Sequence, residues 1–137
     1  GHNRPINREK LDFHTLSEEL NTDGSLRNIV FEGYKSLLRA RSQSQAFHPA
    51  APQRVLATPK TLLAVLRTSA DGSERVLALV NVASEPATAS FIYGELGLTD
   101  EKGFHDLVSG DYVYPSLDDG NRISLELEPH EVLWLRY

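Results

Sequence analysis

The chain has 137 residues, 40% of them hydrophobic and 24% charged, which suits a single globular domain. Its formal net charge of -5 excludes the basic surface of a nucleic-acid-binding protein. No apolar run approaches the roughly 18 residues that a membrane span needs. The chain has no cysteine, which excludes disulfides and thiol chemistry and fits a reducing compartment, so we expect a cytoplasmic location. It also has no methionine, even at position 1, so we expect a part of a longer protein.

Two helices are predicted near the start of the chain. The first covers residues 14–21, with Thr15 placed to cap it, and the second starts after Ser25 and runs to about residue 42. The second helix carries one apolar stripe at helical spacing: Leu26, Ile29, Val30, Tyr34, Leu37 and Leu38. This stripe must pack either on the β structure that follows or on a domain absent from the chain, and the pattern favours neither.

The rest of the chain predicts an antiparallel β-sandwich built from short strands. Residues 61–68 and 74–83 are apolar runs that flank Ala70-Asp71-Gly72-Ser73, which is typical of a hairpin. Further strands are predicted over residues 87–93, 104–108, 111–114, 122–128 and 131–137. The predicted fold is therefore mainly β with N-terminal helices, with a loop and helices over 1–47 and the sandwich over 48–137.

No arrangement of residues that supports catalysis is visible. The five histidines are scattered and form no zinc motif. The run Asp118-Asp119-Gly120-Asn121 lacks the spaced ligands of a calcium loop and predicts a hairpin turn. The acids fall on helix surfaces, turns and a wet strand face, where no pair would be held at about 5–5.5 Å for retaining glycoside cleavage. We therefore predict no catalytic residue, no metal site and no cofactor.

One loop could contact a ligand, the stretch Arg4-Pro5-Ile6-Asn7-Arg8. Guanidinium groups beside a proline-stiffened backbone could bind a phosphate or a sugar hydroxyl. On chemistry alone, a solvated loop is the favoured interpretation.

Four short motifs, in the same order along the chain, resemble the α-amylase superfamily. Residues 3–8 (NRPINR) resemble the R-[DE]-I-N-R stretch of sucrose phosphorylases and their glucosylglycerate phosphorylase relatives. Residues 78–82 (ALVNV) resemble the L-V-N-x-S strand of the superfamily's C-terminal β domain. Residues 106–110 (DLVSG) and 127–135 (LEPHEVLWL) are similar to its D-L-[LI]-[ST]-G hairpin and its closing strand.

The resemblance implies that residues 1–47 are the last loop and helices of a (β/α)8 barrel and that 48–137 form an α-amylase-type C-terminal β domain. The parent would be a retaining glucosyl-transferring phosphorylase, or an α-glucoside hydrolase, whose three catalytic acids lie upstream. The fragment itself would then not be an enzyme, and its partner would be the missing barrel. The full-length protein would bind a sugar substrate and phosphate.

The same resemblance assigns one substrate contact. Arg4 aligns with the arginine that holds the outer hydroxyls of the donor glucosyl ring, a role it would have only with the barrel present. Pro5 stands where sucrose phosphorylases have an acid, so the acceptor stays open, and the departure favours the glucosylglycerate-type branch or another relative.

Two further expectations follow. If the helix stripe normally faces a barrel, the fragment exposes it and should self-associate. The alternative interpretation is a free-standing carbohydrate-binding or interaction module, whose available rings are Tyr93, Tyr112, Tyr114 and Trp134.

Overall fold

The computed structural model describes residues 10–98 and 103–137, so Arg4 and its loop lie outside the described residues. The chain divides into two compact units, residues 1–38 and 39–137, and each is described by itself. The boundary that the sequence places between residues 47 and 48 stays a prediction.

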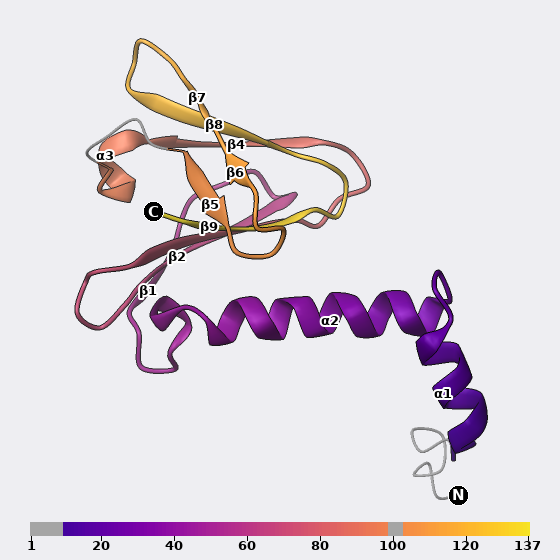
Figure 1. Ribbon diagram of the computed structural model, residues 1–137. Coiled ribbons are helices and arrows are strands. Elements are labelled where there is room, and N and C mark those ends of the chain that lie inside the picture. Colours follow the sequence, from indigo (N-terminus) through magenta and orange to yellow (C-terminus); the bar gives the residue numbers. More distant parts are fainter. Residues whose placement is uncertain (1–9, 99–102) are drawn as a thin grey trace, which may run out of the picture. The chain divides into compact units, whose positions relative to one another are not determined.

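The first unit is built from two helices, α1 (Phe13–Asn21) and most of α2 (Leu26–Ser42) (Figure 1). The predicted cap at Thr15 is wrong, because α1 begins earlier and Asp12 accepts the backbone N–H of Thr15 at 2.9 Å. That hydrogen bond lowers the pKa of the Asp12 carboxyl. The predicted cap of α2 is confirmed, since the backbone N–H of Asn28 donates to the Ser25 hydroxyl at 3.1 Å.

The second unit holds two antiparallel sheets (Figure 1). The six-stranded sheet has the order β1-β2-β3-β9-β5-β6, and the three-stranded sheet has the order β4-β8-β7. The bounds of its elements are η2 (Gln45–Phe47), β1 (Gln53–Val55), β2 (Leu62–Thr68), β3 (Arg75–Asn81), β4 (Ala87–Ile92), α3 (Tyr93–Leu96), β5 (Phe104–Asp106), β6 (Tyr112–Val113), β7 (Ser116–Leu117), β8 (Arg122–Leu127) and β9 (Val132–Arg136).

One core fills the space between the two sheets. Alternate residues of β2, β3 and β9 face it from the larger sheet, and alternate residues of β4 and β8 face it from the smaller one. The most completely buried members include Leu77, Leu79, Leu135, Phe104 and Ile123. The mainly antiparallel β fold with N-terminal helices is thus confirmed, as is the hairpin between β2 and β3.

Four elements of the second unit, η2, β1, α3 and β7, are absent from the sequence prediction. Strands β1 and β7 are short, and neither has a buried residue to mark it in the sequence. Helix α3 ends the strand predicted over 87–93 at Ile92, because a single helical turn starts at Tyr93. This turn closes at Gly97, whose φ of 68° is the left-handed conformation that glycine adopts most readily.

The buried side chain of Asn81, at the end of β3, hydrogen-bonds both to the segment that follows β3 and to the segment that follows β8. Its amide donates to the carbonyl oxygens of Glu85 at 2.8 Å and Glu128 at 3.0 Å, while its oxygen accepts the backbone N–H of Ala83 at 3.0 Å. Asn81 is 1% exposed, so it exchanges none of these partners for water. This explains why an asparagine follows the apolar run of β3.

Asp106 has the same function at the turn after β5. One carboxylate oxygen accepts the backbone N–H of Trp134 at 2.8 Å, and the other accepts that of Ser109 at 2.9 Å. The backbone N–H of Gly110 donates to the Asp106 carbonyl at 2.9 Å, and Gly110 has a φ of 86°. Residues 106–110 therefore form a turn that a carboxylate holds against β9, which is a structural task.

Candidate functional site: apolar docking faces

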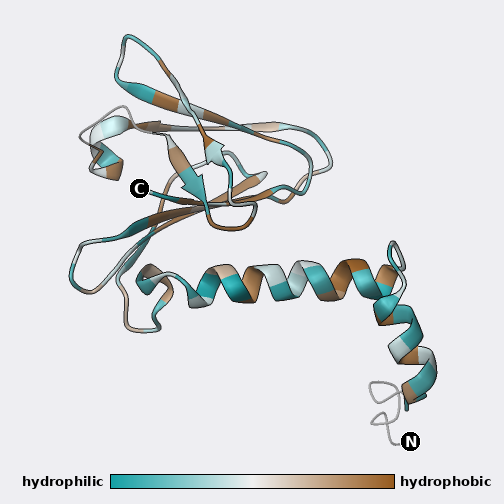
Figure 2. Cartoon of the chain, in the orientation of Figure 1, coloured by the Kyte–Doolittle hydropathy of each residue, from teal (hydrophilic) through white to brown (hydrophobic). Residues whose placement is uncertain are grey.

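The most prominent surface of the first unit is the apolar stripe of α2. Its residues recur on one side of the helix, as the hydropathy colouring of Figure 2 shows. Leu26 is 77% and Tyr34 67% exposed. The other strongly exposed apolar residues of this helix are Ile29, Val30, Phe31 and Leu38. The stripe that the sequence predicts is therefore open, and within residues 10–38 only α1 packs beside it.

A shallow apolar groove of about 750 Å³ lies along this stripe. Leu16 and Leu20 of α1 line it together with residues of α2, among them Val30 and Leu38. The two helices are joined by the turn around Ser25, where the Asn28 amide also donates to the Leu20 carbonyl at 2.9 Å. The groove is thus a feature of the helix pair itself, and its apolar lining suits apolar side chains from another element.

A second apolar surface lies on the outer face of the six-stranded sheet, and we name it the sheet face. It consists of Val55, Leu63, Val65, Val80 and Val132. Cross-strand pairing places Leu63 beside Val80 and Val80 beside Val132, and it places Val55 beside Val65. Val55 is 69% and Leu63 48% exposed. Because Leu62–Leu66 and Val76–Val80 are apolar on both faces, these strands have the composition of strands that are covered on both sides.

One part of this outer face is already covered by η2. The Phe47 ring lies on the Trp134 ring with centroids 4.6 Å apart, and both pack with Val76. Arg67 fixes the segment by donating from Nε to the Ala46 carbonyl at 2.7 Å. Residues of η2 thus cover Val76 and Trp134 on this face, and the sheet face is the apolar part that η2 leaves uncovered.

The structure places the sequence-derived candidates as follows. Trp134 packs on Phe47 and Tyr93 packs against the core, and both are half-buried, whereas Tyr112 and Tyr114 are exposed. The predicted turn at Asp118 is confirmed, since its carboxylate accepts the backbone N–H groups of Gly120 and Arg122 at 2.9 and 2.8 Å.

Two findings concern the described residues alone. Over residues 10–98 and 103–137, no three His, Asp or Glu side chains come together as metal ligands would. None of the helices in these two ranges is long and apolar enough to cross a membrane. Four carboxylates hold turns and helix caps by accepting hydrogen bonds from backbone N–H or hydroxyl groups: Asp12, Asp71, Asp106 and Asp118.

Comparison with known proteins gives these surfaces a context. No known family profile matches the chain. Glucosylglycerate phosphorylase from Spirochaeta thermophila is 44% identical over 138 aligned positions, which cover 98% of this chain and 23% of that protein. Glucosylglycerate phosphorylase from Escherichia coli is 27% identical over 99% of this chain and 22% of its own length. The chain matches the C-terminal region of a glucosylglycerate phosphorylase of the α-amylase family.

Solved structures agree at the level of the fold. An α-amylase from Anoxybacillus superposes with a TM-score of 0.63 at 14% identity, covering 84% of this chain and 23% of that one. A maltogenic α-amylase from Thermotoga neapolitana gives 0.65 at 15% identity, with 84% and 27% covered. The chain thus spans less than a third of each relative, and the resemblance to the α-amylase superfamily read from the four motifs is confirmed.

Proposed function

We propose that this chain is the C-terminal, non-catalytic part of a glucosylglycerate-phosphorylase-like enzyme and that it stabilises the catalytic barrel preceding it. The observation that carries the proposal is the exposed stripe of α2, in a chain that spans only 23% of a relative 44% identical to it. A soluble unit rarely leaves so many large apolar side chains on one helix face uncovered. The occupant of this stripe is the remainder of the enzyme.

The sheet face supports the same proposal independently. Strands with apolar residues on both faces are normally covered on both sides. Burial of one exposed Leu or Val side chain contributes about 1.5–3 kcal/mol, so docking through a few such residues stabilises both partners. In this proposal α1 and α2 are the last helices of the barrel, and the β unit lies against it.

The chemistry of the whole enzyme would be transfer of a glucosyl group to phosphate, as the names of the curated relatives indicate. The resemblance to the α-amylase superfamily implies that this transfer retains the configuration of the sugar. Such a reaction needs two carboxylates on either side of the scissile bond. The described carboxylates whose contacts are seen serve turns, caps and ion pairs, which supports placing the catalytic acids in the preceding part.

A hybrid enzyme tests the docking role. The preceding part of the Spirochaeta thermophila relative would be joined to this chain, and Ile29→Glu would be introduced into the stripe. A glutamate buried in a docked interface costs several kcal/mol, so we expect the hybrid's Tm to fall by about 5 °C. Gln43→Glu adds the same charge at an exposed position off the stripe and should leave the Tm unchanged. Equal melting of the Ile29→Glu and unaltered hybrids would contradict the proposal.

The role of Arg4 is a separate proposal, supported only by the resemblance of its loop. In the same hybrid, Arg4→Lys keeps the charge but removes the fork of guanidinium donors. We expect kcat/KM for glucosylglycerate phosphorolysis to fall about 10- to 100-fold, with the Tm unchanged. A full kcat/KM in this variant would remove Arg4 from the substrate site.

A further inference from the structure

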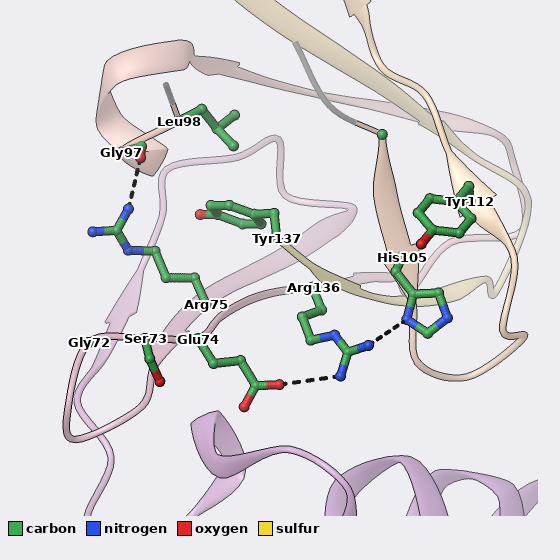
Figure 3. Close-up of a pocket in the computed structure, with 11 residues that line it drawn as sticks. Gly72, Ser73, Glu74, Arg75, Gly97, Leu98, His105, Tyr112, Arg136 and Tyr137 are labelled. Atoms are coloured by element: carbon green, nitrogen blue, oxygen red, sulfur yellow. Dashed lines mark hydrogen bonds and ion pairs between the residues drawn. The ribbon is translucent and has the colours of Figure 1, made fainter. Parts of the chain in front are cut away.

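A polar pocket of about 610 Å³ lies at one end of the six-stranded sheet, beyond the part that η2 covers (Figure 3). Its lining includes Glu74, Arg75, His105, Tyr112, Arg136 and Tyr137. The volume falls in the range of small-molecule sites, about 300–1,000 Å³. Unlike the two docking faces, it is lined mostly by polar groups. It belongs to neither of them, because the sheet face lies toward the opposite end of the same strands.

Three of these side chains form a row across neighbouring strands. Cross-strand pairing sets Arg136 of β9 beside His105 of β5, and His105 beside Tyr112 of β6. Side chains paired in this way project from the same face of a sheet. The Arg136 guanidinium lies 3.2 Å from His105 Nδ1, and the His105 and Tyr112 rings are 5.4 Å apart (Figure 3).

Glu74 holds this row in place from the start of β3. One of its carboxylate oxygens lies 3.7 Å from Arg136 Nη1, and the other accepts the backbone N–H of Gln45 at 2.8 Å. The Arg136 guanidinium is therefore held between a carboxylate and an imidazole, which orients a planar set of N–H donors. The carboxylate also offsets the positive charge, so the row as a whole is a poor site for a lone anion.

The opposite wall is rigid. The Tyr137 hydroxyl donates to the Leu96 carbonyl at 2.9 Å, and Arg75 donates from Nη1 to the Gly97 carbonyl at 2.8 Å. The Tyr137 ring meets the Phe104 ring edge-on with centroids 5.2 Å apart. Burial raises the pKa of the Tyr137 hydroxyl to about 12, so this hydroxyl stays protonated at physiological pH.

Tyr112 gives the pocket an exposed aromatic surface. It is 64% exposed and sits on the two-residue edge strand β6, so the ring is not part of the core. The face of an aromatic ring carries negative charge density and attracts the C–H bonds of an apolar or sugar surface. The ring adjoins His105, and His105 in turn contacts Arg136, so the row has an aromatic face at one end and guanidinium and carboxylate groups at the other. Such a row matches a molecule of more than one sugar ring, which offers both C–H faces and hydroxyls.

We propose that this pocket binds a neutral oligosaccharide, with one sugar ring stacked on Tyr112 and the hydroxyls of a neighbouring ring bonded to Arg136 and Glu74. Sugar hydroxyls both donate and accept, so they pair with a guanidinium and a carboxylate at once. This inference goes beyond the docking role and does not depend on it. It uses the sugar-binding chemistry of the alternative interpretation, but at a defined site.

The test is a titration of the 137-residue chain with maltotriose, followed by ¹H–¹⁵N NMR. We expect saturable shifts of the His105, Tyr112 and Arg136 amides with a Kd of about 1 mM. Tyr112→Ala should weaken binding at least about tenfold, whereas Tyr112→Trp, which enlarges the ring, should preserve it. Tyr114→Ala is the matched control, because Tyr114 is 75% exposed and does not line this pocket. Arg136→Gln, a second variant, should also weaken binding.

Three outcomes would overturn the proposal. The first is the absence of any saturable shift with maltotriose. The second is equal binding by Tyr112→Ala and the unaltered chain, which would place the sugar elsewhere. The third is a response of the same amides to inorganic phosphate alone, which would make the pocket an anion site.

Discussion

At the scale of single residues, the described polar side chains mostly hold turns. Asn81, Asp106 and Asp118 each use a side chain to bind backbone groups that a turn leaves unpaired. Asn81 and Asp106 lie in two of the motifs that resemble the α-amylase superfamily, so these two motifs record structural needs of the sandwich. Their side chains are committed to the fold and leave no group free for chemistry.

Replacement of Asp106 should show the size of this effect. Asp106→Ala leaves the backbone N–H groups of Ser109 and Trp134 without their acceptor, in a place that is 2% exposed. We expect the free energy of unfolding to fall by about 3 kcal/mol, measured by urea denaturation. Asp111→Ala, at an exposed position of the same turn, should change it by less than about 0.5 kcal/mol. Similar values for both variants would show that Asp106 is not the group that holds the turn.

Asp71 in the β2–β3 hairpin predicts a pH dependence. Its carboxylate accepts the hydroxyl of Ser69 at 2.6 Å, then the backbone N–H and hydroxyl of Ser73 at 3.1 and 2.8 Å, and these bonds lower its pKa from 3.8 to about 2. Because the folded-state pKa is depressed, the stabilisation is complete above pH 3.8 and is lost as the pH falls toward 2.

Asp71→Asn should therefore remove part of the acid sensitivity of unfolding between pH 4 and pH 2, which is measured by denaturation at several pH values. An NMR titration of the Asp71 carboxyl should give a midpoint near 2. The matched control is Asp119→Asn in the exposed turn after β7, which should keep the full acid dependence. An Asp71 midpoint near the usual value would mean that the three hydrogen bonds do not persist in solution.

At the scale of elements, the spacing of apolar residues in the sequence predicted the strands whose alternate side chains are buried in the core. The β2–β3 hairpin and the alternation of β8 follow from side chains that face either the core or water, and the structure has both. Helical spacing likewise predicted the stripe of α2, although the stripe is exposed in this structure. The β1 and β7 strands could not be found in this way, because their residues are exposed and only pairing defines them. The polar pocket was also beyond the sequence, since Glu74, His105 and Arg136 meet only through the order of β3, β9 and β5.

Two glycines allow opposite predictions for two helices. Gly97 ends α3 with a φ of 68°, and a Cβ there would lie 2.3 Å from Arg75 Nη1. Gly97→Ala should therefore lower the free energy of unfolding by about 1–2 kcal/mol.

Gly33 lies inside α2, and a Cβ there meets nothing within 4 Å. Gly33→Ala should raise helicity in circular dichroism and stabilise the helix by about 0.5–1 kcal/mol. Destabilisation by Gly33→Ala would mean that the helix is not continuous in solution.

At the scale of the whole chain, each unit leaves an apolar surface that it cannot cover by itself. The stripe of α2 belongs to the first unit and the sheet face to the second, and both are made of aliphatic or aromatic side chains at regular spacing. The sheet face is not part of the core of the second unit, because that core already lies between the two sheets. Both surfaces make sense as parts of a larger enzyme.

Self-association of the isolated chain is the consequence that is simplest to measure. Without a preceding barrel, the open stripe of α2 should pair with a second copy, so sedimentation velocity should show a weight-average mass that rises with concentration. Ile29→Glu places a charge within the stripe and should shift the distribution toward monomer. Gln43→Glu adds the same charge off the stripe and should associate like the unaltered chain. A concentration-independent monomer would mean that the stripe is not sticky enough to recruit a partner through apolar contact alone, which would weaken the docking proposal as well.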